Sequence, residues 1–121
     1  MGDRSSIYIK SDDNLDQWLH LYGHWSGDSN TKAVAEVLRK TDRIGDMAYL
    51  TAQMFYEFSV YLGSYTGSLG FGIDICNTTP AEWFDDNPPV IVNADTGDVE
   101  WRNENYTRTE FVNLIIGETN G

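Results

Sequence analysis

Alternating apolar and polar positions mark the first two strands of this chain. In "SSIYIKS", residues 5–11, Ile7 and Ile9 alternate with Tyr8 and polar neighbours, which is the period-two pattern of a half-buried strand. The run "WLHLYGHW", residues 18–25, alternates as well, and the turn residues between the two runs predict an antiparallel hairpin. One face of the second strand would carry Leu19, Leu21 and Trp25. The other face would carry a row of aromatic and imidazole side chains: Trp18, His20, Tyr22 and His24.

A spacing of three and four residues marks two helices. Residues 31–40 place four apolar side chains on one stripe, after short polar residues that can cap a helix: Ala33, Val34, Val37 and Leu38. A second helix is predicted over residues 47–62, with Asp46 as its N-cap, and its other faces are also largely apolar. Because such a helix is usually covered on more than one side, we expect it to be the central packing element against the sheet.

The C-terminal half predicts three more strands and a last helix. "FGIDIC", residues 71–76, alternates, and residues 90–92 and 99–101 form a hairpin about the turn at 95–97. Thr107 and Glu110 fit a capping box that opens a helix, and Gly117 would end that helix. The order of elements predicts a single α+β domain over residues 1–121, with a mainly antiparallel sheet of about five strands packed against two to three helices.

Charge narrows the classes of partner. The net charge is −11, and residues 44–121 hold twelve acids against two bases. Such a field repels nucleic acid and anionic membranes and attracts basic protein surfaces, although acidity can also serve solubility alone. A single cysteine, Cys76, cannot close an internal disulfide, and residues 1–10 do not read as a signal peptide. We therefore expect a cytoplasmic protein that binds neither nucleic acid nor membrane directly, with a homodimer left open.

The motifs that suggest catalysis or metal binding have simpler explanations. Residues four apart on a strand are separated by about 13 Å, so His20 and His24 could not share a zinc ion without a bulge. The triplet Asp95-Thr96-Gly97 occurs in aspartic proteases, but here it lies in a hairpin turn next to Asp98, where turn chemistry explains it better. The sequence offers neither a nucleophile motif nor a metal set, so we expect no catalytic residues, no metal and no cofactor.

An acidic loop with two aromatic residues is the strongest candidate for binding. In "AEWFDDNPP", Trp83 and Phe84 are flanked by Glu82, Asp85 and Asp86, a composition typical of an interface for a basic partner. Alternatively, the two aromatic side chains pack into the core while the acids are solvated. We expect the partner surface to comprise nine residues of the C-terminal half: Asp74, Glu82, Trp83, Phe84, Asp85, Asp86, Asp95, Asp98 and Glu100.

Three stretches, "MGDRSSIYI", "LHLYGHWSG" and "GFGIDI", resemble a pattern in small acidic proteins, mostly uncharacterised, of bacteriophages and of actinobacterial and other bacterial genomes. That pattern runs from a Met-Gly-x-Arg start into a strand, then through a Tyr-x-His-Trp strand and helices to a Gly-Phe-Gly-Ile strand. The resemblance covers about half the chain and implies an origin without an activity. A phage protein of this kind would be similar to inhibitors that occupy nucleic-acid-binding surfaces of host proteins, in the host cytoplasm.

Three functions follow as hypotheses. The first is a non-enzymatic inhibitor whose carboxylates imitate phosphates in the basic groove of a host defence or transcription protein, in the manner of an anti-CRISPR-like DNA mimic. The second is a small-ligand module that stacks a nucleotide-type ring on the Trp18, His20, Tyr22 and His24 face. The third is a small hydrolase with His20 or His24 as general base.

Overall fold

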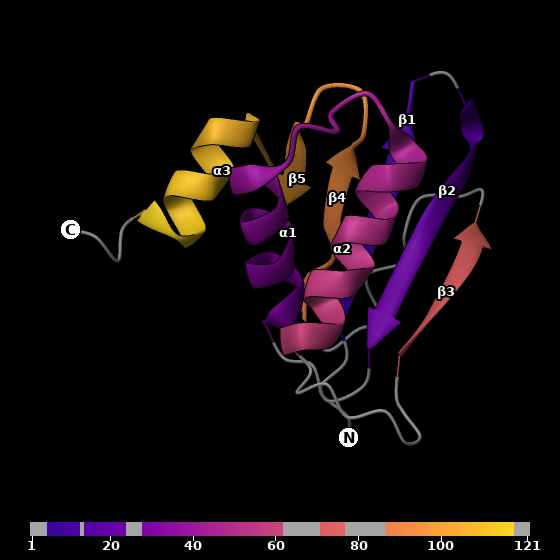
Figure 1. Cartoon of the computed structure of the whole chain (residues 1–121), viewed down its shortest axis with the longest axis horizontal. Coiled ribbons are helices and arrows are strands. Elements are labelled where there is room, and N and C mark those ends of the chain that lie inside the picture. Colours follow the sequence, from indigo (N-terminus) through magenta and orange to yellow (C-terminus); the bar gives the residue numbers. More distant parts are fainter. Residues whose placement is uncertain (1–4, 13, 24–27, 62–70, 77–86, 118–121) are drawn as a thin grey trace.

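The structure, a computed structural model, describes residues 5–12, 14–23, 28–61, 71–76 and 87–117. These ranges contain six strands and three helices (Figure 1). In chain order they are β1 (Ser5–Ser11), β2 (Asn14–Gly23), α1 (Ser29–Lys40), α2 (Met47–Tyr61), β3 (Phe71–Cys76), β4 (Val90–Asn93), β5 (Val99–Trp101), β6 (Glu104–Tyr106) and α3 (Arg108–Ile115).

The strands form one sheet in the order β3-β2-β1-β4-β5-β6. Only β1 and β4 run parallel, and the other four neighbouring pairs are antiparallel. The predicted α+β class with a mainly antiparallel sheet is therefore confirmed. The expected number of about five strands omitted β6, which pairs with β5 across a two-residue turn where Arg102 and Asn103 have φ of 55° and 65°.

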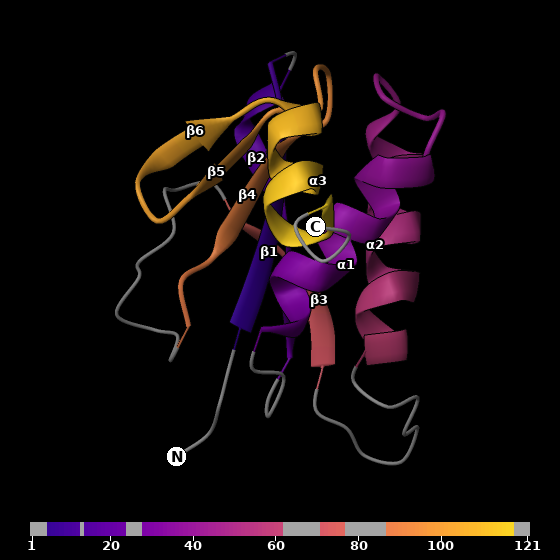
Figure 2. The same ribbon diagram turned by 90° about the vertical axis from the view of Figure 1, so that its left-hand side faces the viewer.

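The two faces of the sheet have different coverings. All three helices lie on one side, which we call the helix-bearing face (Figure 2). Alternation along β1 sends Ile7 and Ile9 to that side, where both are fully buried. The opposite side, which we call the helix-free face, receives the alternate positions, among them Tyr8 of β1 and its cross-strand partner His20 of β2.

The core forms between the helix-bearing face and the helices. The expectation that residues 47–62 form the central helix was wrong, because α1 lies between α2 and α3 (Figure 1). Small side chains allow α1 to approach its neighbours on several sides, and Ala33, Val34 and Ala35 are completely buried. Helix α2 buries Leu50, Met54 and Phe58 but turns exposed side chains outward on its other faces.

The predicted capping box at the start of α3 is confirmed, and the helix ends at Ile115, two residues before Gly117. Thr107 Oγ1 accepts a hydrogen bond from the backbone N–H of Glu110, and the Glu110 carboxylate accepts one from the N–H of Thr107. This capping box satisfies N–H groups at the start of α3.

No helix among the described residues is long and apolar enough to cross a membrane.

Candidate binding surface

Three loops that are distant in sequence meet at one end of the molecule. The backbone N–H of Gly45, between α1 and α2, donates to the carbonyl of Ala94 at 2.7 Å. The β1–β2 turn joins the β4–β5 turn through Asp95, whose carboxylate accepts from Ser11 Oγ at 3.1 and 3.3 Å and from the N–H of Asp12 at 2.7 Å. These bonds fix the three loops relative to one another.

Each of these loops contributes aspartates. We call the resulting area the loop-end surface and define it by five residues: Asp12, Asp42, Asp46, Asp95 and Asp98. Asp42 has a side chain that is 95% exposed, and Asp98 is also exposed. Asp95 differs from the others because its carboxylate holds the neighbouring turn, so its main role here is structural.

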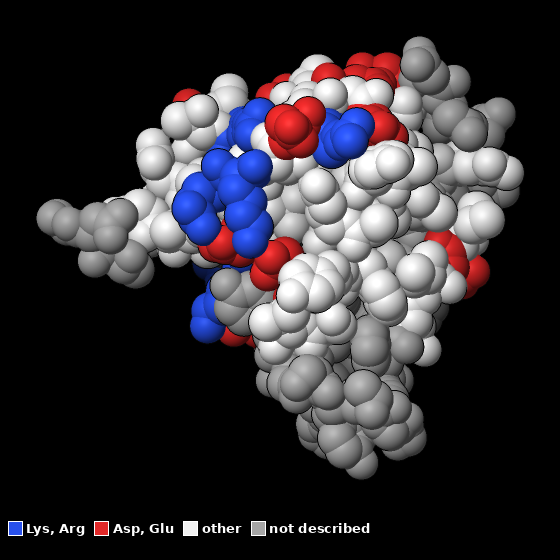
Figure 3. Space-filling model, in the orientation of Figure 1, with Lys and Arg blue, Asp and Glu red and all other residues white. Residues whose placement is uncertain are grey.

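Among the described residues, these five carboxylates have three basic side chains in or beside the loops: Arg43, Arg108 and Lys10, which lines a hollow with Asp98. Arg43 lies 3.9 Å from both Asp42 and Asp46. Arg108 directs its guanidinium to the carbonyls of Leu38 and Thr41, at the end of α1. Figure 3 shows acidic side chains along the top edge of this face, with basic side chains between them, and a large area without charged side chains below. The loop-end surface therefore keeps an excess of negative charge.

A groove between α1 and α2 begins next to this surface. It encloses about 470 Å³ and is lined by residues that include Asp42, Tyr49, Gln53, Tyr56 and Glu57. Tyr49 and Tyr56 are 55% and 65% exposed. Tyrosines beside carboxylates combine contact area with a polar hydroxyl, which is common at protein interfaces.

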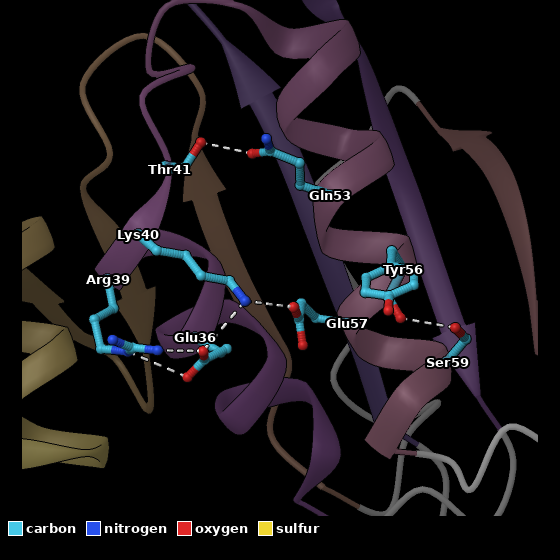
Figure 4. A network of polar contacts seen from close by, with 8 residues as sticks. All are labelled: Glu36, Arg39, Lys40, Thr41, Gln53, Tyr56, Glu57 and Ser59. Carbon is cyan, nitrogen blue, oxygen red and sulfur yellow. Dashed lines mark hydrogen bonds and ion pairs between the residues drawn. The ribbon is translucent and has the colours of Figure 1, made fainter.

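Ion pairs form one wall of the groove (Figure 4). Lys40 Nζ lies 3.0 Å from Glu57 Oε2 and 3.4 Å from Glu36 Oε2, while Arg39 pairs with Glu36. The hydrogen bond from Arg39 lowers the pKa of Glu36, with a smaller effect from Lys40. The hydrogen bond to Glu57 raises the pKa of Lys40, and the hydrogen bond to Glu36 adds a smaller effect in the same direction. Glu57 is 8% exposed, and its pairing with Lys40 offsets the cost of burying its charge.

The aromatic row predicted on β2 lies on the helix-free face, where its rings contact one another. His20 stacks on Tyr8 with ring centroids 4.3 Å apart and an interplanar angle of 3°. Trp18 meets Tyr8 edge-on at 6.3 Å, and Tyr22 lies 5.8 Å from His20. A ring face of His20 that would stack on a ligand is thus already covered by Tyr8.

Ser6, His20 and Asp74 lie on three adjacent strands, an arrangement with the residue types of a catalytic triad. Ser6 Oγ and His20 Nε2 are 2.9 Å apart, and Asp74 is the β3 partner of His20. However, Ser6 is 1% exposed, so a substrate carbonyl could not reach its hydroxyl in this conformation. The Asp74 carboxylate instead accepts from the N–H of Ile75 at 2.8 Å.

The remaining predicted acids of the sheet lie apart from Asp74. Cross-strand pairing places Glu100 in the same row as Asp74 on the helix-free face, but β2, β1 and β4 lie between them. Glu100 and Asp98 share a hollow of about 300 Å³ whose lining includes Lys10 and Glu110. Asp98 therefore lies beside Glu100 in this hollow and shares the β4–β5 turn with Asp95.

Other predicted site residues lie outside the described residues: His24, Glu82, Trp83, Phe84, Asp85 and Asp86. Among the residues that the structure describes, no group of three His, Cys, Asp or Glu side chains could hold a metal ion. Asp12, Asp42 and Asp46 were not among the predicted site residues. The sequence marks Asp46 only as an N-cap and Asp12 and Asp42 only as turn residues, and pairing of their turns with the β4–β5 turn could not be predicted from the sequence.

Comparison with known proteins found no matching family model, no matching curated protein and no matching solved structure.

Proposed function

We propose that this protein is a non-enzymatic binding protein that places its loop-end surface on the basic, nucleic-acid-binding surface of a partner protein. The observation that carries the proposal is the meeting of aspartates from three loops at one end of the chain's fold, held by bonds such as Asp12 N–H to Asp95 Oδ2 at 2.7 Å. Fixed loops present their carboxylates without a large loss of conformational entropy on binding.

Carboxylates in this arrangement can take the place of nucleic-acid phosphates. A surface that binds DNA carries lysines and arginines spaced to contact successive phosphates. Asp42, Asp46 and Asp98 offer negative groups to such side chains, and the net charge of −11 accelerates the encounter. Binding should then weaken as salt screens the charges.

The α1–α2 groove supplies contact area next to the charges. Tyr49 already holds a guanidinium of this chain, because the Arg43 Cζ lies 4.2 Å from its ring centroid. Tyr56, further along the same helix, is exposed for a similar contact with a partner. The tyrosines would act as anchors, while the aspartates select a basic partner.

The proposed partner class is a host defence or transcription protein, with the chain acting as a phage-encoded inhibitor in the host cytoplasm. This part of the proposal depends on the resemblance of "MGDRSSIYI" and "LHLYGHWSG" to phage proteins and on the acidic character of the chain.

The test uses two variants with equal changes in charge. The first, Asp42→Asn with Asp46→Asn and Asp98→Asn, removes three charges of the loop-end surface, and asparagine at position 46 can still cap α2. The control, Asp16→Asn with Asp28→Asn and Glu104→Gln, removes three charges elsewhere. Each immobilised protein is offered bacterial nucleic-acid-binding proteins purified on heparin.

The proposal predicts that the wild-type protein retains one of these proteins, that duplex DNA or added salt displaces it, and that only the loop-end variant loses it. If both variants lost retention equally, total charge and not this surface would be responsible. Retention that neither DNA nor salt reduced would contradict phosphate imitation.

A further inference from the structure

Strand β3 forms an edge of the sheet and carries two exposed isoleucines. Ile73 and Ile75 are 55% and 60% exposed, and their partners on β2 are Leu21 and Leu19, which place them on the helix-bearing face. The sequence of β3, FGIDIC, contains neither lysine nor proline, the residues that usually protect an edge strand from pairing. An apolar edge of this kind is a template for another strand.

The hydrogen-bonding direction of the edge follows from one contact. The N–H of Ile75 donates to Oδ1 of Asp74 at 2.8 Å, which indicates that this N–H points away from β2. Because a residue in an antiparallel strand directs its N–H and C=O to the same side, and successive residues alternate, Ile73 also directs both groups outward. Exposed apolar side chains and outward backbone groups therefore coincide at the same two residues.

We propose that β3 pairs antiparallel with β3 of a second copy of this chain, with the two-fold axis at Ile73. Residues that face each other in an antiparallel pair point to the same side of the sheet. A two-fold axis perpendicular to the sheet must therefore bring one residue opposite its own copy in the second strand. This restricts the pairing to a few registers.

Charge and length select the register at Ile73. An axis at Asp74 would place two carboxylates opposite each other, which is unfavourable. An axis at Gly72 or Ile75 would leave a shorter overlap within Phe71–Cys76. With the axis at Ile73, Asp74 lies opposite Gly72 of the second copy, and Ile75 lies opposite Phe71.

The chosen register also suits the space at Gly72. The Tyr22 ring lies 3.0 Å from the position that a Cβ at residue 72 would take, so a larger residue would displace that ring. A glycine there leaves room on the helix-free face beside Asp74 of the second copy. On the helix-bearing face, the isoleucines of the two copies become neighbours and remove apolar surface from water.

Salt should strengthen this association. Each chain carries a net charge of −11, so two copies repel each other at low ionic strength, and screening reduces the repulsion. The proposed partner binding has the opposite salt dependence. The two proposals can therefore fail separately.

Sedimentation velocity over a concentration series at low and high salt tests the dimer. The wild-type protein should approach the mass of two chains at high concentration, and more so at high salt. Ile73→Lys should weaken the dimer by about tenfold or more, because like charges replace facing apolar side chains. Asn113→Lys adds the same charge at an exposed position on α3, and it should dimerise like the wild type.

Disulfide formation tests the register. In a Cys76→Ser background, Ile73→Cys should form a symmetric disulfide, because facing residues of a hydrogen-bonded pair have Cα atoms about 5.5 Å apart. Ile75→Cys should not, since the two copies of residue 75 would be about 13 Å apart. A wild-type chain that stays monomeric under all conditions, a dimer that Ile73→Lys leaves intact, or faster cross-linking at position 75 would overturn the proposal.

Discussion

Removal of the Asp95 carboxylate should destabilise the protein, whereas removal of the neighbouring Asp98 carboxylate should have little effect on stability. Asp95 accepts two contacts from Ser11 Oγ and one from the N–H of Asp12. Hydrogen bonds to a charged group contribute about 1.5–3 kcal/mol each when buried. Asp12 is exposed and can turn its N–H to water, whereas Ser11 is 7% exposed. We therefore expect Asp95→Ala to lower the free energy of unfolding by about 2 kcal/mol.

Urea unfolding followed by tryptophan fluorescence measures this difference, since the chain has four tryptophans. Asp98→Ala removes an exposed acid from the same turn and should stay within about 0.5 kcal/mol of the wild type. Ser11→Ala should cost less in the Asp95→Ala background than in the wild type, because the shared bond is already lost. Equal free energies of unfolding for Asp95→Ala and Asp98→Ala would refute the assignment of Asp95 as the link between the turns.

Two further predictions concern pH and backbone conformation. Arg39 lowers the folded-state pKa of Glu36 below its ordinary value of 4.5, so the stability that Glu36 contributes is present above pH 4.5 and is lost as pH falls through the lowered pKa. Glu36→Gln should flatten this acid limb in thermal melts taken across that range. Gly97→Ala should destabilise the protein by more than Gly45→Ala in urea unfolding. Both glycines have positive φ, of 84° and 95°, but a Cβ at Gly97 would lie 3.2 Å from Ile44 Cδ1, and one at Gly45 would meet nothing within 4 Å. A rank order reversed between the two would contradict the described packing of the turn.

The sequence predicted the elements whose pattern is local. Alternation of apolar residues about Ile7 predicted a strand, and helical spacing about Val34 predicted a helix. Both patterns reflect burial of one face, and both segments form the expected element, β1 and α1. Strand β6 was missed because Glu104–Tyr106 is short and polar, and its turn uses Arg102 and Asn103 instead of the glycine that usually marks such a hairpin.

Arrangement in space was harder to predict than the elements themselves. The apolar character of α2 suggested a central helix, but burial depends on neighbours, and α2 leaves Tyr49, Tyr56 and Val60 exposed. Of the loop-end surface, only Asp95 and Asp98 were predicted, because the meeting of the three turns depends on contacts between distant parts of the chain. Asp12 and Asp95 are 83 residues apart in the hydrogen bond that joins their turns, and no local pattern reveals that contact.

The salt dependence of partner binding tests the central claim most directly. The dissociation constant for the retained nucleic-acid-binding protein should be measured across a salt series for the wild type, the loop-end variant and the control variant. Phosphate imitation predicts that affinity falls steeply with salt for the wild type and the control, and that the loop-end variant shows a clearly shallower salt dependence. An equal slope for all three proteins would contradict the account.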